Sequence, residues 1–245
     1  MRRLFYKGLL ADTIEITGGD AHHLMHVMRA KAGQEIIVVD DENQVALMEM
    51  TAFREEAVTL ALKERLAADT ESPLDLVLAQ CLLKADKMDY VVQKAVELGV
   101  TKIIPVKSQN CVVRYDAKKA AARQERWQKI AAEAAKQCGR TALTEVTPIT
   151  DLANLLVDNG SIESTEIVFC YENEAENTVK SCLQAAKGKR LLLLIGPEGG
   201  FTLEEAAQVQ NSGGKAVTLG PRILRAETAA VAAITVAQYE NGDLG

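Results

Sequence analysis

Two short loops in the last quarter of the chain contain the residues best suited to hold a ligand. The first loop, Gly196 to Gly200 (Gly-Pro-Glu-Gly-Gly), follows the apolar run 191–195, and the second, Gly220 to Glu227, follows the apolar run 216–219. Each loop precedes a stretch with helical spacing of apolar residues, which indicates a strand, a loop and a helix. In open α/β sheets, ligands bind at such loops, outside the carboxyl ends of the strands.

The first loop favours close approach of a ligand to the backbone. Gly199 and Gly200 permit positive φ angles, and Pro197 fixes one φ. The loop lacks both the Lys-Ser/Thr end of a P-loop and the G-x-G-x-x-G fingerprint, and Glu198 would repel a polyphosphate. A neutral, zwitterionic or cationic cofactor such as S-adenosylmethionine suits these residues better. The alternative is a tight strand-to-helix turn without a ligand.

The elements that position these loops alternate between strand and helix after about residue 73. We expect strands at 74–82, 102–106, 145–149 and 166–171, and helices at 87–98, 117–138, 151–159 and 178–186. Gly99 and Gly139 end two of the helices, and Asp151 caps a third. This alternation predicts an α/β fold with a mostly parallel sheet and helices on both of its faces.

Two further features concern the helices that follow the loops. Thr202 and Glu205 predict a capping box, so that a helix begins just after Phe201. The run 229–239 contains almost no charge, which predicts a helix that is buried all round. Some of that burial is expected to come from a second copy of the chain.

Residues 1–72 predict a separate, small β-barrel domain. Strand-like runs lie at 4–6, 13–17, 35–39, 45–53 and 58–62, separated by turn residues. One helix interrupts them, from Asp20, its expected N-cap, to about Ala30. The polar segment 69–73 ends in a proline and is expected to link this domain to a second domain at 73–245.

Composition excludes several classes of protein. The chain has 245 residues, 48% of them hydrophobic, which is enough for one large or two modest domains. No run of 18 apolar residues exists, so no membrane span is expected. Charged residues follow Arg2 and Arg3 too closely for a signal peptide. Five cysteines form no C-x-x-C pair, so we expect reduced thiols in a cytoplasmic protein.

Charge is distributed unevenly along the chain. The net charge is −6 and the pI about 5.3. Between Lys84 and Arg140, however, 13 Lys and Arg residues stand against 6 Asp and Glu. A locally basic face on an acidic protein suits a selective polyanion partner, and a set of solvated helix faces is the alternative. Because an acidic protein binds phosphates weakly without such a face, a structured RNA surface is favoured over naked RNA.

All three histidines lie on the predicted N-terminal helix. His22 and His26 are four residues apart and share a face of it. No further residues with metal-ligand spacing accompany them, so no metal site is expected. One interpretation is that these histidines contact RNA, together with Arg29 and Lys31 nearby. The alternative is an ordinary helix surface.

The two loops also carry a family resemblance. The stretches 193–201 (Leu-Leu-Ile-Gly-Pro-Glu-Gly-Gly-Phe) and 219–229 (Leu-Gly-Pro-Arg-Ile-Leu-Arg-Ala-Glu-Thr-Ala) resemble the cofactor-binding signature of the SPOUT methyltransferases. Within them the sequence is most similar to the ribosomal RNA small subunit methyltransferase E family, which methylates N3 of a uridine in 16S rRNA. The stretches 84–99 and 137–140 match patterns of the same family. The resemblance covers nearly the whole chain and departs only slightly, at Ala226 and Phe201.

The resemblance implies a fold and a set of partners. It implies a PUA-like RNA-binding domain at 1–72 and a SPOUT methyltransferase domain at 73–245, whose C-terminal segment forms a trefoil knot, a rare exception to unthreaded topology. It further implies a cytoplasmic homodimer that uses S-adenosylmethionine. The expected substrate is 16S rRNA within the assembled 30S subunit.

The resemblance also implies site residues. Those expected to bind the cofactor come from both loops and the elements flanking them: Leu194, Ile195, Gly196, Pro197, Glu198, Gly199, Gly200, Leu219, Gly220, Ile223, Leu224, Ala226, Thr228 and Ala229. Those expected to bind RNA are mostly basic: Arg2, Arg3, His23, Arg29, Lys84, Lys87 and Lys94. For Lys94, a role in complementing the helix dipole is an equal alternative.

Methylation of uracil N3 places a clear demand on the catalytic residues. The N3–H must be lost or nearly lost, so negative charge develops on O2 and O4, and an arginine against those oxygens lowers the barrier. We expect Arg225 to be this arginine, with Arg140 second. Glu227 is expected to act as a base or to orient an arginine, while capping the last helix together with Thr228 is the alternative.

Two other functions fit parts of the sequence. An RNA-binding module without catalysis would use the basic segment and the N-terminal domain equally well, but it would not need the two loops. A dinucleotide oxidoreductase shares the α/β pattern but requires the glycine fingerprint that is missing here.

Overall fold

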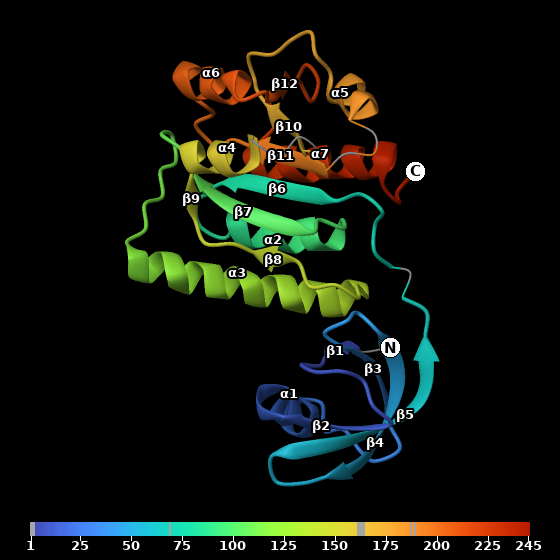
Figure 1. Cartoon of the computed structure of the whole chain (residues 1–245). Helices are drawn as coiled ribbons and strands as arrows, with labels where there is room; N and C mark the ends of the chain where they lie inside the picture. Colours follow the sequence, from blue (N-terminus) through green and yellow to red (C-terminus); the bar gives the residue numbers. More distant parts are fainter. Residues whose placement is uncertain (1–2, 69, 161–164, 187, 189) are drawn as a thin grey trace. The chain divides into compact units, whose positions relative to one another are not determined.

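The structure, a computed structural model, describes residues 3–68, 70–160, 165–186, 188 and 190–245. The chain forms two compact units (Figure 1). The first consists of Met1–Glu71 with Ala135–Ala142, and the second of Ser72–Ala134 with Leu143–Gly245. This division differs from the expected boundary after residue 72 by the segment Ala135–Ala142, which groups with the first unit.

The first unit is built on one five-stranded sheet in the order β1-β3-β4-β5-β2. β1 pairs with β3 in parallel, and the other pairs are antiparallel. Because β1 and β2 are the two edges of this sheet in the described part of the chain, the sheet is a half-barrel and not the closed β-barrel that the sequence predicts. Its strands are β1 (Arg3–Phe5), β2 (Thr13–Thr17), β3 (Glu35–Val39), β4 (Val45–Phe53) and β5 (Ala57–Leu66).

The core of this unit follows from the two-residue period of its strands. In β2, Ile14 and Ile16 are buried while the three threonine and glutamate neighbours are exposed. Together with Ala21 and Leu24 from the helical segment after β2, they join one apolar cluster. The alternation thus turns one face of the sheet toward the core.

The helical segment differs from its prediction. It consists of a short helix, α1 (Gly18–His22), and one π-helical turn, η1 (His23–Val27). Asp20 is not the N-cap: Thr17, with extended backbone, takes that position, because the helix starts at the glycine directly after β2. Asp20 lies in the first turn instead, where a carboxylate interacts favourably with the helix dipole.

Glu71 joins the segment Ala135–Ala142 to the first unit. Its Oε2 accepts hydrogen bonds from Nε and Nη2 of Arg140, at 3.0 and 2.7 Å. Its Oε1 accepts from the backbone amides of Thr141 and Ala142, at 2.7 and 3.0 Å. Arg140 is only 5% exposed, so its charge is compensated by this carboxylate.

These contacts predict a pH dependence of stability. Burial acts to raise the pKa of Glu71, but the hydrogen bonds from Arg140, Ala142 and Thr141 outweigh it and hold the pKa below its ordinary value of 4.5. A carboxyl group with a depressed folded-state pKa stabilises the fold above its unfolded pKa, and this contribution is lost as the pH falls through the folded pKa. We therefore expect Glu71→Gln to reduce the free energy of unfolding at neutral pH and to flatten its decline in acid.

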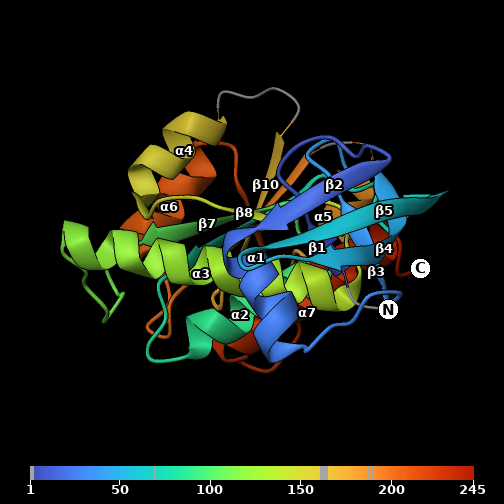
Figure 2. The ribbon, with the colours of Figure 1, turned by 90° about the horizontal axis from the view of Figure 1, so that it is seen from below.

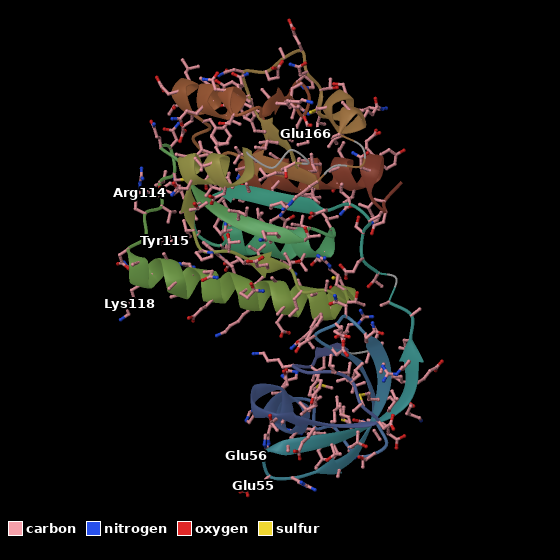
Figure 3. The ribbon with its side chains drawn as sticks, in the orientation of Figure 1. Glu55, Glu56, Arg114, Tyr115, Lys118 and Glu166 are labelled. Atoms are coloured by element: carbon pink, nitrogen blue, oxygen red, sulfur yellow. The ribbon has the colours of Figure 1, made fainter. Side chains whose placement is uncertain are left out.

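Urea denaturation at a series of pH values between about 7 and 3 measures this difference. The matched control is Glu55→Gln at the turn between β4 and β5, where the side chain is exposed (Figure 3) and forms no ion pair with any described residue. The role of Glu71 is contradicted if the free energy of unfolding of Glu71→Gln depends on pH in the same way as that of the unchanged protein.

The second unit contains the predicted parallel sheet. Its strands follow the order β12-β10-β11-β6-β7-β8, β9 also pairs with β7, and every pairing is parallel. The predicted strand at 145–149 is divided into two short strands. The strands are β6 (Leu76–Cys81), β7 (Lys102–Lys107), β8 (Glu145–Val146), β9 (Thr150–Asp151), β10 (Thr165–Cys170), β11 (Arg190–Ile195) and β12 (Lys215–Val217).

Helices cover both faces of this sheet. Figure 2 shows α4 and α6 on one side of the strands and α2 and α7 on the other, which explains why β6 is buried along its whole length. Gly99, with φ of 82°, ends α2 as predicted. The helices are α2 (Lys87–Glu97), α3 (Ala117–Cys138), α4 (Leu152–Gly160), α5 (Val179–Ala185), α6 (Leu203–Asn211) and α7 (Ala226–Asn241).

Helix α7 differs from its prediction in two ways. It begins at Ala226, three residues before the expected start, with Arg225 as its N-cap. It is also not buried all round within the single chain. One face, including Ala230 and Ala233, is fully buried, while Tyr239 on the opposite face is 63% exposed. The remaining members of that opposite face are Thr228, Val231, Ala232, Thr235 and Val236, which are exposed or half-buried.

Three findings describe the rest of the molecule. Among the described residues, no helix is long and apolar enough to cross a membrane. No group of three or more His, Cys, Asp or Glu side chains in the described part of the chain could hold a metal ion. All five cysteines are free thiols.

Candidate active site

The first glycine loop is a tight turn at the end of β11. The amide of Gly200 donates a hydrogen bond to the carbonyl of Pro197 at 3.0 Å, and Gly200 has a φ of 67°. A Cβ on Gly196 would lie 3.1 Å from the ring of Phe201. Glycine is therefore required at these two positions by the packing and backbone of the loop itself.

The capping box predicted after this loop is confirmed. Thr202 Oγ1 accepts from the amide of Glu205 at 3.2 Å, and Glu205 Oε2 accepts from the amide of Thr202 at 3.1 Å. These bonds satisfy two donors at the start of α6. They also fix the direction in which the chain leaves the loop.

The second loop is open. Gly220 has a φ of 108°, and no described atom lies within 4 Å of the position that a Cβ would take there. Ile223 is 90% exposed, and Arg225 is exposed as well. The loop thus presents an apolar side chain, a guanidinium group and free space beside its backbone.

Lys87, at the start of α2, connects the two loops. Its Nζ lies 3.4 Å from Glu198 Oε1 of the first loop and 3.2 Å from Glu227 Oε2 of the second. The contact with Glu227 is an ion pair only, since this buried oxygen accepts no hydrogen bond from the described residues. Glu198 Oε1 also accepts from the amide of Lys84 at 3.1 Å. One lysine therefore holds both carboxylates and, through them, both loops.

Glu198 is stabilised in its charged form. Burial acts to raise the pKa of this carboxyl, but hydrogen bonds from the amides of Lys84 and of Glu198 itself, together with Lys87, hold the pKa below its ordinary value. A carboxylate with a lowered pKa is a weak base. Glu198 is thus suited to fixing the loop and not to accepting a proton.

A third loop, Ser108–Asp116, lies against the first. Asn110 Nδ2 donates to the carbonyls of Gly199 and Gly200, at 3.1 and 3.2 Å. The amide of Gln109 donates to Glu205 Oε1 at 2.8 Å. Glu205, only 3% exposed, therefore binds the start of α6 with one oxygen and this third loop with the other.

We expect Glu205→Ala to lower the free energy of unfolding by about 2 kcal/mol, because it leaves the amides of Gln109 and Thr202 without their acceptor. Chemical denaturation at pH 7 measures the change. Glu204→Ala is the matched control, since Glu204 occupies the same helical turn but is exposed. Equal free energies of unfolding for Glu205→Ala and Glu204→Ala would contradict a stabilising role of the Glu205 carboxylate.

The comparison with known proteins bears on both units. The RNA methyltransferase domain family matches residues 70–238, and the RNA methyltransferase PUA domain family matches residues 16–62. The chain is 34% identical over 235 residues to ribosomal RNA small subunit methyltransferase E of Bacillus subtilis, covering 94% of this chain and 91% of the relative. The chain belongs to the ribosomal RNA small subunit methyltransferase E family.

Other relatives extend this comparison over the full length. The enzyme of the same name from Buchnera aphidicola (strain Sg) is 30% identical over 252 residues, covering 99% of this chain and 97% of the relative. A solved structure is described as ribosomal RNA small subunit methyltransferase E from Neisseria gonorrhoeae bound to S-adenosyl methionine. It is 33% identical, with a TM-score of 0.90 over 100% of both chains.

The catalytic residues predicted from the family have different surroundings. Arg225 is exposed and forms no ion pair with any described residue. Arg140 is buried against Glu71, which favours a structural role for it. Glu227 is held by Lys87. The structure thus brings Glu227 and the first loop together through Lys87, and leaves the guanidinium of Arg225 unengaged.

The residues predicted to bind RNA also separate into groups. In the first unit, His23 and Arg29 are exposed, while Arg3 donates to the carbonyl of Gly139. In the second unit, Lys84 is exposed, and Lys94 pairs with Glu97 at 2.7 Å. Arg2 lies outside the described residues. Exposure favours His23, Arg29 and Lys84 for contact with RNA.

Sequence reasoning missed two residues of the site. Asn110 belongs to no motif, so only the fold reveals its contact with the first loop. Gln80, fully buried in β6, lies with its Nε2 3.4 Å from the carbonyl of Gly196, while its Oε1 accepts no hydrogen bond from the described residues. A signal did exist for Gln80: it is a lone amide in an apolar strand, and buried amides need partners.

Proposed function

We propose that this protein transfers a methyl group from S-adenosylmethionine to N3 of a uridine in 16S rRNA of the small ribosomal subunit. The observation that carries the proposal is the pair of glycine loops joined through Glu198, Lys87 and Glu227. Membership of the ribosomal RNA small subunit methyltransferase E family supports the substrate, and the Neisseria relative supports the cofactor.

The residues of the two loops fit this cofactor. Free space beside Gly220 and the exposed side chain of Ile223 suit an adenine ring and a ribose. The unsatisfied side-chain oxygen of Gln80 is an acceptor for an amino group. We therefore assign cofactor contacts to the two loops, as expected from the sequence. When bound, the cofactor supplies an electrophilic methyl group on a sulfonium.

The chain supplies positive charge where the uracil becomes negative. Arg225 is the N-cap residue of α7, so its backbone lies at the positive end of a sixteen-residue helix dipole and its exposed side chain extends from that point. We assign to Arg225 the stabilisation of charge on O2 and O4 as the N3 proton leaves. The remaining contribution is the positioning of N3 against the methyl carbon.

Glu227 is better suited to orientation than to proton transfer. Its Oε2 lies 3.2 Å from Nζ of Lys87, so the carboxylate is engaged in the bridge between the two loops. We therefore assign to Glu227 the task of holding the start of α7, and with it Arg225, in place. Arg140 has no role in the proposed reaction.

We also propose that the active form is a homodimer. The face of α7 that includes Val231, Val236 and Tyr239 is largely apolar and only partly covered, and Tyr90 of the adjacent α2 is 46% exposed. A second copy would bury both. Light scattering at working concentration tests this proposal, and a monomer there would contradict it.

The expected substrate form is the assembled 30S subunit, in the cytoplasm. The net charge of −6 opposes indiscriminate binding to phosphates. The folded rRNA surface of the assembled subunit offers more contacts than free RNA does, and these contacts compensate for the unfavourable net charge. Methylation of 30S subunits at a rate below that of deproteinised 16S rRNA would contradict this part of the proposal.

The proposal as a whole is tested with methyl-labelled S-adenosylmethionine and unmethylated 30S subunits, followed by digestion of the rRNA to nucleosides. Label in 3-methyluridine is the expected result. Label in another nucleoside would keep the methyltransferase and reject the assigned atom. Absence of both labelling and calorimetric binding of the cofactor would favour an RNA-binding module without catalysis.

A further inference from the structure

Three basic residues, one on the loop that precedes α3 and two in the first turns of this helix, have no part in the proposed mechanism. They are Arg114, Lys118 and Arg123, and together with Tyr115 we call them the α3 cation cluster. The Arg123 Cζ lies 5.7 Å from the centroid of the Tyr115 ring, which is the geometry of a cation–π contact. Figure 3 shows Arg114 on the loop that leads into α3, Tyr115 closer to the helix, and Lys118 at the start of α3, pointing away from the ribbon.

None of these three cations forms an ion pair with a carboxylate in the described part of the chain, although Arg114 lines one pocket together with Asp151 and Glu205. Arg114 uses Nη2 to donate to the carbonyl of Gln109 at 3.0 Å, and Arg123 lies over a neutral ring. Two neighbouring cations on the same helix are paired: Lys119 lies 4.0 Å from Asp116, and Arg126 lies 2.6 Å from Asp89. The positive charge of the cluster is therefore available to a ligand.

Stability of the helix does not explain the cluster. Lys118 lies in the first turn of α3, which contains no acidic residue. A cation there opposes the helix dipole and is unfavourable for the helix. Asp116, just before the helix, offsets part of this by accepting from the amide of Lys119 at 2.8 Å.

The cluster is connected to the proposed methyl-transfer site through the loop Ser108–Asp116. Asn110 binds the carbonyls of Gly199 and Gly200 at 3.1 and 3.2 Å, and Arg114 lies four residues further along the same loop. Four residues of chain span at most about 14 Å. A nucleotide at the cluster would therefore lie within a few nucleotides of one at the glycine loops.

We infer that the α3 cation cluster binds the unpaired RNA strand beside the target uridine. Arg114 and Lys118 hold phosphates, and a neighbouring base stacks on the pair formed by Arg123 and Tyr115. Stacking on aromatic rings and on guanidinium planes is how proteins take hold of unpaired bases, whereas paired bases are not accessible to it. This inference rests on the proposed rRNA substrate and adds to it a second place of contact.

The test combines binding and kinetics with unmethylated 30S subunits. We expect Tyr115→Ala to weaken binding of the subunits about tenfold, the size of one lost base–aromatic stack, and to raise KM by a similar factor while kcat and the Kd for S-adenosylmethionine change little. Tyr115→Phe keeps the ring and is expected to restore binding. We expect Arg114→Ala and Lys118→Ala each to reduce the slope of log K against log salt concentration by about 1.

Lys119→Ala is the matched control, because Lys119 is adjacent in the helix but paired with Asp116. Effects of Tyr115→Ala and Lys118→Ala no larger than those of Lys119→Ala would overturn the inference while leaving the methyltransferase proposal intact. Binding of 30S subunits is measured by co-sedimentation, which needs no catalysis. The inference can therefore be confirmed or rejected even where the unchanged protein transfers no label.

Discussion

Replacing Arg225 with alanine is expected to lower kcat for methyl transfer to 30S subunits by about 10²–10³-fold, the usual effect of removing one group that stabilises developing charge. The Kd for S-adenosylmethionine is expected to change less than about threefold, because the exposed guanidinium acts on the uracil and not on the cofactor. Single-turnover methylation with labelled donor gives the rate, and isothermal calorimetry gives the Kd.

Arg222→Ala is the matched control for this prediction. Arg222 lies in the same loop and is exposed, so its removal changes the local charge equally without affecting the N-cap of α7. Arg225→Lys is expected to recover only part of the rate, because an ammonium group lacks the planar pair of donors. Equal rates for Arg222→Ala and Arg225→Ala would remove Arg225 from the mechanism.

Replacing Lys87 with methionine is expected to weaken binding of S-adenosylmethionine by about tenfold or more, a loss of about 1.4 kcal/mol. Without Nζ, Glu198 and Glu227 lose the cation they share at 3.4 and 3.2 Å. Two neighbouring carboxylates then repel each other and push the loops apart. Calorimetry with the cofactor alone, in the absence of RNA, measures this effect.

Two variants separate the bridge from the RNA contact that the sequence predicted for Lys87. Lys87→Arg keeps a cation that can reach both carboxylates, and is expected to bind the cofactor nearly as well as the unchanged protein. Lys84→Ala removes a neighbouring exposed cation but keeps the backbone amide that binds Glu198. An unaltered cofactor Kd in Lys87→Met, with a raised KM for 30S subunits, would restore Lys87 to the RNA-binding residues.

Local patterns predicted most of the fold. The strand-like run 13–17 predicted β2 with its observed bounds, and Thr202 with Glu205 predicted the start of α6, because each signal is complete within a few residues. The predicted starts of two helices, at Asp20 and Ala229, were wrong. There, Gly18 and the extended backbone of Arg225 decide the start, and several nearby residues could equally serve as the cap.

The candidate site was predicted in its loops but not in its connections. Glycines at 199, 200 and 220 are visible in the sequence because they stand between a strand and a helix. The bridge made by Lys87 and the contact of Asn110 with the first loop join segments about 90 or more residues apart, and no local pattern encodes them. The pairing of Arg140 with Glu71, which lies 69 positions away, was not predicted for the same reason.

The amide of Asn110 also has a thermodynamic consequence. It ties Gly199 and Gly200 to the same loop that carries Arg114 and Tyr115, so a strand of RNA that shifts this loop changes the affinity for the methyl donor. Linkage then requires the donor to change the affinity for RNA by the same factor. The affinities of the protein for its two reactants are therefore expected to be coupled, so that the Kd for S-adenosylmethionine measured with bound 30S subunits differs from the Kd measured without them.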